Sequence, residues 1–174
     1  MSRPQPAKPA KLVIGLLLND NDLFPGVCRD LEQVYGVTEL VSPWMEFDFT
    51  DYYAPEMGPS LRRRMLVFKE LIAQTDLARI KLQTNEVELK YANEGRRCIN
   101  IDPGYLLFER FVLATGKNYS HRIYIGHGIY ADLTLIYRQG AYQSLPWTYP
   151  DYANAAMGEF LSLARRMYAA NIRG

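Results

Sequence analysis

The sequence predicts an α/β fold of the α+β type in a single domain, built on one mixed β-sheet. Residues 12–18 are apolar without alternation, as in a central strand that is covered on both faces. In the second half of the chain, apolar and polar residues alternate, which predicts antiparallel hairpins. Towards the end, apolar residues recur at helical spacing, which predicts a C-terminal helix. The length of 174 residues fits one domain with a single core.

The chain begins with a Pro-rich stretch, which predicts a disordered tail over residues 1–10 and a single domain over residues 11–174. The apolar run after this tail is too short to cross a bilayer and lacks the small-residue cleavage site of a signal peptide. Cys28 and Cys98 have no metal-ligand spacing, and two ordinary thiols suit a reducing compartment. We therefore expect a cytoplasmic protein that has no membrane partner.

The first part of the chain predicts a β-α-β-α opening. After the first strand, residues 22–35 have the apolar spacing of a helix, and Gly36 ends it. A strand over residues 38–48 follows, and a loop rich in proline then leads to a second helix from Ser60. On this second helix, Arg62–Arg64 would form a solvated face.

The alternation over residues 86–102 predicts the first hairpin, with its turn at Asn93–Gly95. Asp102–Gly104 has the composition of a turn and is expected to end the second strand. The next segment, residues 106–115, fits either a helix or a strand.

The second hairpin is expected to pair residues 121–125 with residues 129–137 around Gly126–Gly128. The C-terminal helix is expected to start near Pro150. Thr148–Asp151 has the spacing of a capping box, so we assign these residues a structural role at the start of that helix.

Acidic residues in the first predicted hairpin suggest a metal site. A three-residue turn would place Glu86 opposite Asp102 and Glu88 opposite Asn100, so two carboxylates and an amide oxygen would share one face. Oxygen ligands of this kind suit Mg²⁺ or Mn²⁺. The alternative is a solvated strand face on which Lys90 and nearby arginines neutralise the carboxylates.

Basic residues gather just before the second hairpin. Lys117, His121 and Arg122 lie at the start of a predicted strand, where phosphate or carboxylate groups are often held. The alternative is structural, because the same hairpin register places Arg122 opposite Asp132 as a cross-strand ion pair. Tyr124 and Thr134 would lie on the same face as Arg122, which gives a surface on which a base could stack.

The leading functional hypothesis is a small-ligand protein, enzymatic or not, that binds a phosphorylated or nucleotide-like anion. His121 and Asp102 are the catalytic candidates. The candidate ligand-binding residues are Arg97, Asn100, Lys117, Arg122, Tyr124 and Thr134, and the candidate metal ligands are Glu86, Glu88 and Asp102. The alternative is a non-catalytic protein-interaction module with an exposed aromatic face.

The net charge and the absence of known motifs limit the classes of partner and of chemistry that we expect. The 20 basic and 19 acidic residues leave no broad positive field, so nucleic acid is not an expected partner. No phosphate-binding loop, nucleophile elbow, dinucleotide fingerprint or zinc-protease motif occurs in the sequence. Nothing in the pattern specifies an oligomeric state.

Six phrases of the sequence, in this order, resemble the bacterial family catalogued as domain of unknown function 4416. They are Asp51–Tyr53 with Glu56–Gly58, Ile80–Leu82 with Thr84–Asn85, Asn100–Tyr105, His121–Tyr124, Thr134–Leu135 and Trp147–Tyr152. The resemblance covers nearly the whole chain. It implies no activity, and it assigns no residue a catalytic role.

Overall fold

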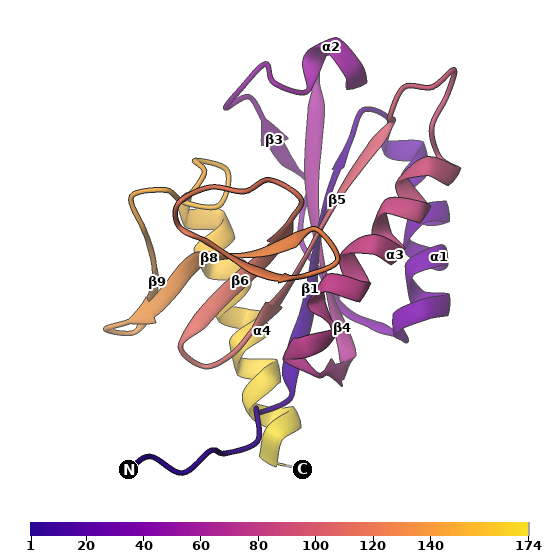
Figure 1. Ribbon diagram of the computed structural model, residues 1–174. Coiled ribbons are helices and arrows are strands. Elements are labelled where there is room, and N and C mark those ends of the chain that lie inside the picture. The colour runs from indigo at the N-terminus through magenta and orange to yellow at the C-terminus, as the bar shows by residue number, and fades with distance from the viewer. Residues whose placement is uncertain (174) are drawn as a thin grey trace.

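The computed structural model describes residues 1–173 and has an α+β fold, as predicted (Figure 1). Residues 1–9 are exposed and have no regular secondary structure. The strands are β1 (Ala10–Leu18), β2 (Thr38–Val41), β3 (Met45–Phe47), β4 (Leu61–Ile72), β5 (Ile99–Leu106), β6 (Arg110–Thr115), β7 (Arg122–Gly126), β8 (Ile129–Arg138) and β9 (Ala141–Ser144). The helices are α1 (Phe24–Tyr35), α2 (Ala54–Met57), α3 (Leu77–Lys90) and α4 (Ala155–Arg173), with short 3-10 turns at Asn21–Leu23 and Gln74–Asp76.

The strands form one sheet in the order β2-β4-β1-β5-β6-β8-β7, with β3 paired to β4 and β9 paired to β8. Strand β1 is buried along its whole length between β4 and β5, as its unbroken apolar run predicts. All strand pairs within residues 1–173 are antiparallel. The expectation of a mixed sheet is therefore corrected to an antiparallel one.

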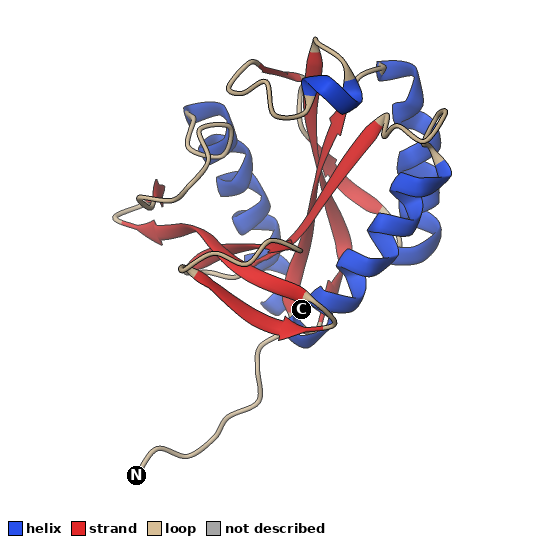
Figure 2. Ribbon diagram, turned by 45° about the horizontal axis from the view of Figure 1, so that its top comes forward, coloured by secondary structure: helices blue, strands red, loops and turns tan. Residues whose placement is uncertain are grey.

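Helices cover both faces of the sheet. Helices α1 and α3 lie together on one face, and α4 lies on the other, as Figures 1 and 2 show. Under α1 and α3 the core contains Leu12, Ile14, Leu16, Ile99 and Ile101. Under α4 it contains Val13, Met65, Val67, Leu161 and Tyr168. Alternate residues of β1 thus belong to opposite cores, as the two-residue period of a strand requires.

Two predicted elements are wrong. The helix predicted from Ser60 is strand β4, which pairs with β1, β2 and β3. Only the four-residue α2 supplies a second helix to the opening. Residues 86–90 of the strand predicted over residues 86–91 belong to helix α3, so the register that placed Glu86 opposite Asp102 does not exist. Helix α3 buries the polar residues Lys81, Thr84 and Glu88, which masks its apolar period in the sequence.

The later predictions agree better with the structure. The second hairpin forms around the expected turn, and Arg122 lies opposite Asp132 in its register. Residues 110–115, within the segment that the sequence left open, form β6. The C-terminal helix is confirmed, but its first turn is capped by Asn154, whose side-chain oxygen accepts from the Met157 N–H. The capping box predicted at Thr148–Asp151 is therefore wrong.

The sheet divides at β5. Strand β6 pairs with β5 only over Gly104–Leu106, and within residues 1–173 no strand pairs with the first half of β5 on that side. A Cβ atom on Gly104 would lie 2.5 Å from the carbonyl oxygen of Val112, so glycine allows the two backbones to approach at the point of division. Pro103 precedes this point and has no N–H to donate. The segment Asp102–Gly104, expected as a turn, instead lies inside β5.

Candidate ligand-binding cleft

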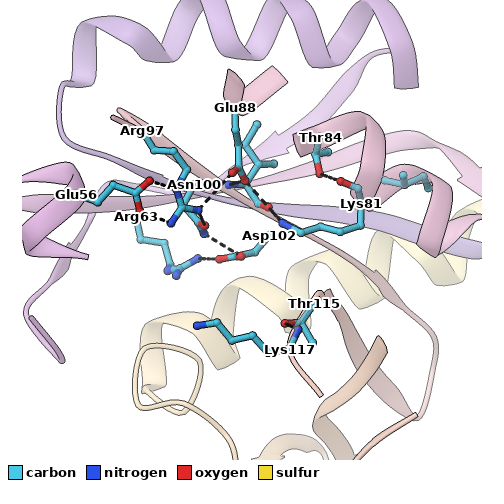
Figure 3. A network of polar contacts seen from close by, with 12 residues as sticks. Glu56, Arg63, Lys81, Thr84, Glu88, Arg97, Asn100, Asp102, Thr115 and Lys117 are labelled. Carbon is cyan, nitrogen blue, oxygen red and sulfur yellow. Dashed lines mark hydrogen bonds and ion pairs between the residues drawn. The ribbon is translucent and has the colours of Figure 1, made fainter. Parts of the chain in front are cut away.

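A cleft of about 610 Å³ lies where β5 and β6 diverge. Its polar floor consists of Arg63, Lys81, Glu88, Asn100, Asp102 and Asp151. Across the cleft from the floor is a second polar surface, which we call the far wall. It consists of Lys117 in the loop after β6, Arg122 on β7 and Asp132 on β8. Figure 3 shows Lys117 across from the polar network of the floor.

Side chains of helix α3 supply hydrogen-bond partners to the backbone at the free edge of β5. The Glu88 carboxylate accepts a hydrogen bond from the Ile101 N–H at 2.7 Å, and the Lys81 ammonium donates to the Ile101 carbonyl at 2.6 Å. The two side chains also form an ion pair at 3.7 Å. Side chains thus replace the missing strand, because buried backbone groups need hydrogen-bond partners. This arrangement keeps the edge closed to another strand and places two charged groups on the cleft floor.

Arg63 is the central cation of the floor and is almost fully buried. Its guanidinium forms a 2.7 Å ion pair with Asp151, a longer 3.4 Å contact with Asp102, and a 3.0 Å hydrogen bond to the Tyr152 hydroxyl. The Tyr152 ring lies under the same guanidinium at 4.8 Å. Arg63 therefore ties β4 to β5 and to the segment that precedes α4.

A chain of hydrogen bonds fixes the Asp102 carboxylate at the open edge. The amide of Asn100 donates to Asp102 Oδ1 at 2.9 Å and accepts from Arg97 at 3.1 Å. Arg97 in turn makes two short bonds to Glu56, at 2.7 and 2.6 Å, which hold the guanidinium in a fork geometry. The Asp102 side chain remains 21% exposed, the most accessible carboxyl of the floor.

The far wall holds a second set of polar contacts. Arg122 Nε donates to Asp132 at 2.7 Å, and the same carboxylate oxygen lies 3.2 Å from His121 Nε2. The His121 ring stacks on Trp147 with a centroid distance of 5.0 Å. Lys117 donates to the Tyr52 hydroxyl at 2.8 Å and lies over that ring, which joins the far wall to the loop after β3.

Aromatic rings form a third side of the cleft, which we call the aromatic wall: Phe47, Phe49, Tyr52 and Tyr53. Three pairs of these rings pack edge to face, with centroid distances of 5.0 to 6.0 Å. Phe47 contacts both Phe49 and Tyr53, and Tyr53 also contacts Tyr52. Such contacts stabilise the wall by about 1 kcal/mol per ring pair beyond the burial of area. Apolar rings beside charged groups suit a flat heteroaromatic ligand with a polar substituent.

The charges of the cleft are distributed unevenly. The floor holds two cationic side chains against three carboxyl groups, and Arg97, which also lines the cleft, adds a third cation beside Asn100. The far wall holds two cationic side chains against one carboxyl group. Burial raises the pKa of Glu88 and, separately, that of Asp151, because desolvation disfavours their charged forms. A side-chain hydrogen bond from Arg97 lowers the pKa of Glu56. The exposed Asp102 carboxylate of the floor suits a hydrogen-bond donor, and the excess of cations on the far wall suits an anion.

The predicted metal site does not form. Glu86 is exposed on α3 and lies outside the cleft, while Glu88 and Asp102 are held by lysine, arginine and asparagine side chains. Among residues 1–173, no three His, Cys, Asp or Glu side chains come together in a way that could hold a metal ion. None of the helices in this described part of the chain is long and apolar enough to cross a membrane.

A family model described as "Domain of unknown function (DUF4416)" matches residues 8–168. The chain belongs to this family. No curated protein and no solved structure matches it in the other two comparisons. In this DUF4416 chain, five of the six phrases that carry the resemblance contribute residues to the cleft, and only the phrase Thr134–Leu135 does not.

The cleft brings together many of the residues predicted from the sequence. Asp102, Asn100, Arg97, Glu88, Lys117 and Arg122 line it. Thr134 is buried behind the far wall, where its hydroxyl bonds to Asp132, and His121 reaches the cleft only through that carboxylate. Tyr124 is exposed on β7 against Tyr130 and lies outside the cleft.

Sequence reasoning missed three central residues of this DUF4416 chain. Arg63 was predicted on a solvated helix face, but β4 points it into the floor. Asp151 was assigned to a helix cap, but it pairs with Arg63. Lys81 drew no prediction. The available signal was the period of two through Leu61, Arg63 and Met65, which the helical spacing of the same segment obscured.

Proposed function

We propose that this protein binds a small nucleotide-like anion in the cleft between β5 and the far wall. The observation that carries the proposal is the combination of an aromatic wall, a floor with an exposed carboxylate and a basic far wall in one cavity of about 610 Å³. That volume lies within the range of small-molecule sites in proteins. A bacterial cytoplasm, where nucleotides are abundant and thiols stay reduced, is the location that suits this role.

The distribution of charge orients the ligand. A heteroaromatic base would stack on the aromatic wall with its polar edge towards the floor. Its phosphate or other anionic group would meet Lys117 and Arg122, which are the cations of the far wall. Lys117 would exchange its contact with the Tyr52 hydroxyl for the anion, because an ammonium group binds a charged oxygen more strongly than a neutral hydroxyl.

The same geometry supports ligand binding over the alternative of a protein-interaction module. A module of that kind would present its rings as a contiguous flat patch, whereas here the rings of the aromatic wall surround a cavity. For catalysis on the bound anion, Glu88 and Asp151 are better acid candidates than His121. Both line the cleft, and burial raises the pKa of each.

Calorimetric titration at low salt tests this proposal. We would titrate the full chain with AMP, GMP, CMP, UMP, inorganic phosphate and pyrophosphate. We expect at least one nucleotide to bind, with Lys117→Ala weakening its affinity by about tenfold because one charge-assisted hydrogen bond is lost.

Lys69→Ala, an exposed lysine substitution on β4 outside the cleft, is the matched control and should leave the affinity unchanged. If no nucleotide binds, the proposed function is wrong. Self-association in light scattering would then favour the interaction module. Equal losses in Lys117→Ala and Lys69→Ala would contradict the assigned site.

A further inference from the structure

Asp102 is the part of the floor most available to a ligand. Its carboxylate has about four acceptor positions, as any ionised carboxylate does. The Asn100 amide and the Arg63 guanidinium occupy two of them, one on each oxygen. Each oxygen therefore keeps acceptor capacity, and the side chain is 21% exposed where it lines the cleft.

Each donor side chain of the floor already bonds to another group of the protein, and Arg63 Nε, which has no partner, is enclosed and out of reach of a ligand. Lys81 bonds to the Ile101 carbonyl and Arg63 bonds to Asp151, while the Asn100 amide donates to Asp102. All three are buried. What the floor offers to a ligand is thus mainly an acceptor with negative charge.

We propose that Asp102 makes the cleft selective for heteroaromatic rings that carry an exocyclic amino group, and against the rings in which oxygen or hydrogen replaces it. This inference rests on the proposed function and adds the chemistry by which the base is recognised. A carboxylate accepts well from a ring amino group, as it does from the N4 amino group of cytosine. A carbonyl oxygen in the same place would oppose the carboxylate and leave its remaining acceptor positions without a donor, which costs affinity.

Matched nucleotides that differ at this group test the inference. The pairs are GMP with IMP, AMP with IMP, and CMP with UMP, titrated into the full chain by calorimetry. We expect the tightest-binding nucleotide to carry an amino group and to bind about 10- to 100-fold more tightly than its partner.

Asp102→Asn replaces one acceptor oxygen by a donor without a change of size. We expect it to reduce the preference for the amino-bearing nucleotide to within about threefold, mainly through weaker binding of that nucleotide. Asp22→Asn, at an exposed carboxylate outside the cleft, is the control and should keep the full preference. The wild-type preference can be measured even if Asp102→Asn fails to fold.

The outcomes separate the two proposals. Nucleotide binding with equal affinity for both members of every pair would overturn the role of Asp102 and leave the proposed function standing. A preference that persists in folded Asp102→Asn would also overturn it. Absence of binding by every nucleotide would overturn both proposals.

Discussion

Single buried charges determine both the stability of the cleft and its chemistry. Arg63 has partners from three separate segments of the chain: the Asp102 carboxylate, the adjacent Asp151 carboxylate and Tyr152 hydroxyl and ring, and the Phe47 ring. A buried ion of this kind costs desolvation energy that only its partners offset. Removing one partner therefore has a larger effect than removing an exposed charge nearby.

Arg63→Ala should lower the free energy of unfolding by about 3–5 kcal/mol, because it leaves Asp151 buried without a cationic partner. Urea denaturation measures the change. Arg62→Ala, at the adjacent position, breaks an exposed pair with Glu46 and should cost at most about 1 kcal/mol. Similar losses in the two variants would contradict the central position of Arg63.

Glu88 should give the protein a measurable pH dependence. Because burial raises its pKa in the folded state, the folded protein holds this proton to a higher pH than the unfolded chain does. The carboxyl therefore contributes less to stability as the pH rises through the interval above its ordinary pKa. Glu88→Gln does not titrate and still offers an oxygen to the Ile101 N–H.

We expect the free energy of unfolding of the wild type, minus that of Glu88→Gln, to fall as the pH rises from about 4 to 7. Urea denaturation at several pH values checks this trend. Glu86→Gln changes an exposed residue of the same helix, so its free energy of unfolding should differ from that of the wild type by a nearly constant amount over this pH range. A wild-type advantage that grows with pH would contradict a raised pKa for Glu88.

At the scale of elements, the point of division between β5 and β6 creates the cleft. The two strands meet at Gly104, and the free edge of β5 beyond it depends on α3 for its hydrogen bonds. Neither the division of the strands nor the role of α3 could be predicted from the sequence, because Asp102–Gly104 has the composition of a turn. The sequence does not predict helix α3 either, because three of the residues that it turns inwards, Lys81, Thr84 and Glu88, are polar and interrupt its apolar period.

Gly104→Ala should destabilise the protein by about 1–3 kcal/mol, because the added methyl group would collide with the Val112 carbonyl in β6. Thermal and urea unfolding measure the loss. Gly158→Ala in α4 has open space around the new Cβ and should stabilise the helix by up to about 1 kcal/mol. Destabilisation by both substitutions, or by neither, would contradict the close approach at Gly104.

At the scale of the whole molecule, the cleft is assembled from segments that are distant in the sequence. The aromatic wall comes from the region after β3, the floor from β4, α3, β5 and the segment before α4, and the far wall from the strands that diverge from β5. Lys11 adds a long-range link, because its buried ammonium bonds to Glu39 on β2 and to Asn171 near the end of α4. These contacts join α4 to β1 and β2.

The sequence alone determined the local features of this protein: the buried strand β1, helix α1 with its end at Gly36, the second hairpin with Arg122 opposite Asp132, and the C-terminal helix. Each depends on a period or a turn within a short stretch of chain. Only the tertiary structure decided that residues 61–72 form a strand and that Arg63, Lys81, Glu88, Asp102 and Asp151 share one cleft. Pairing partners and buried charges are properties of segments far apart in the sequence, so no local pattern specifies them.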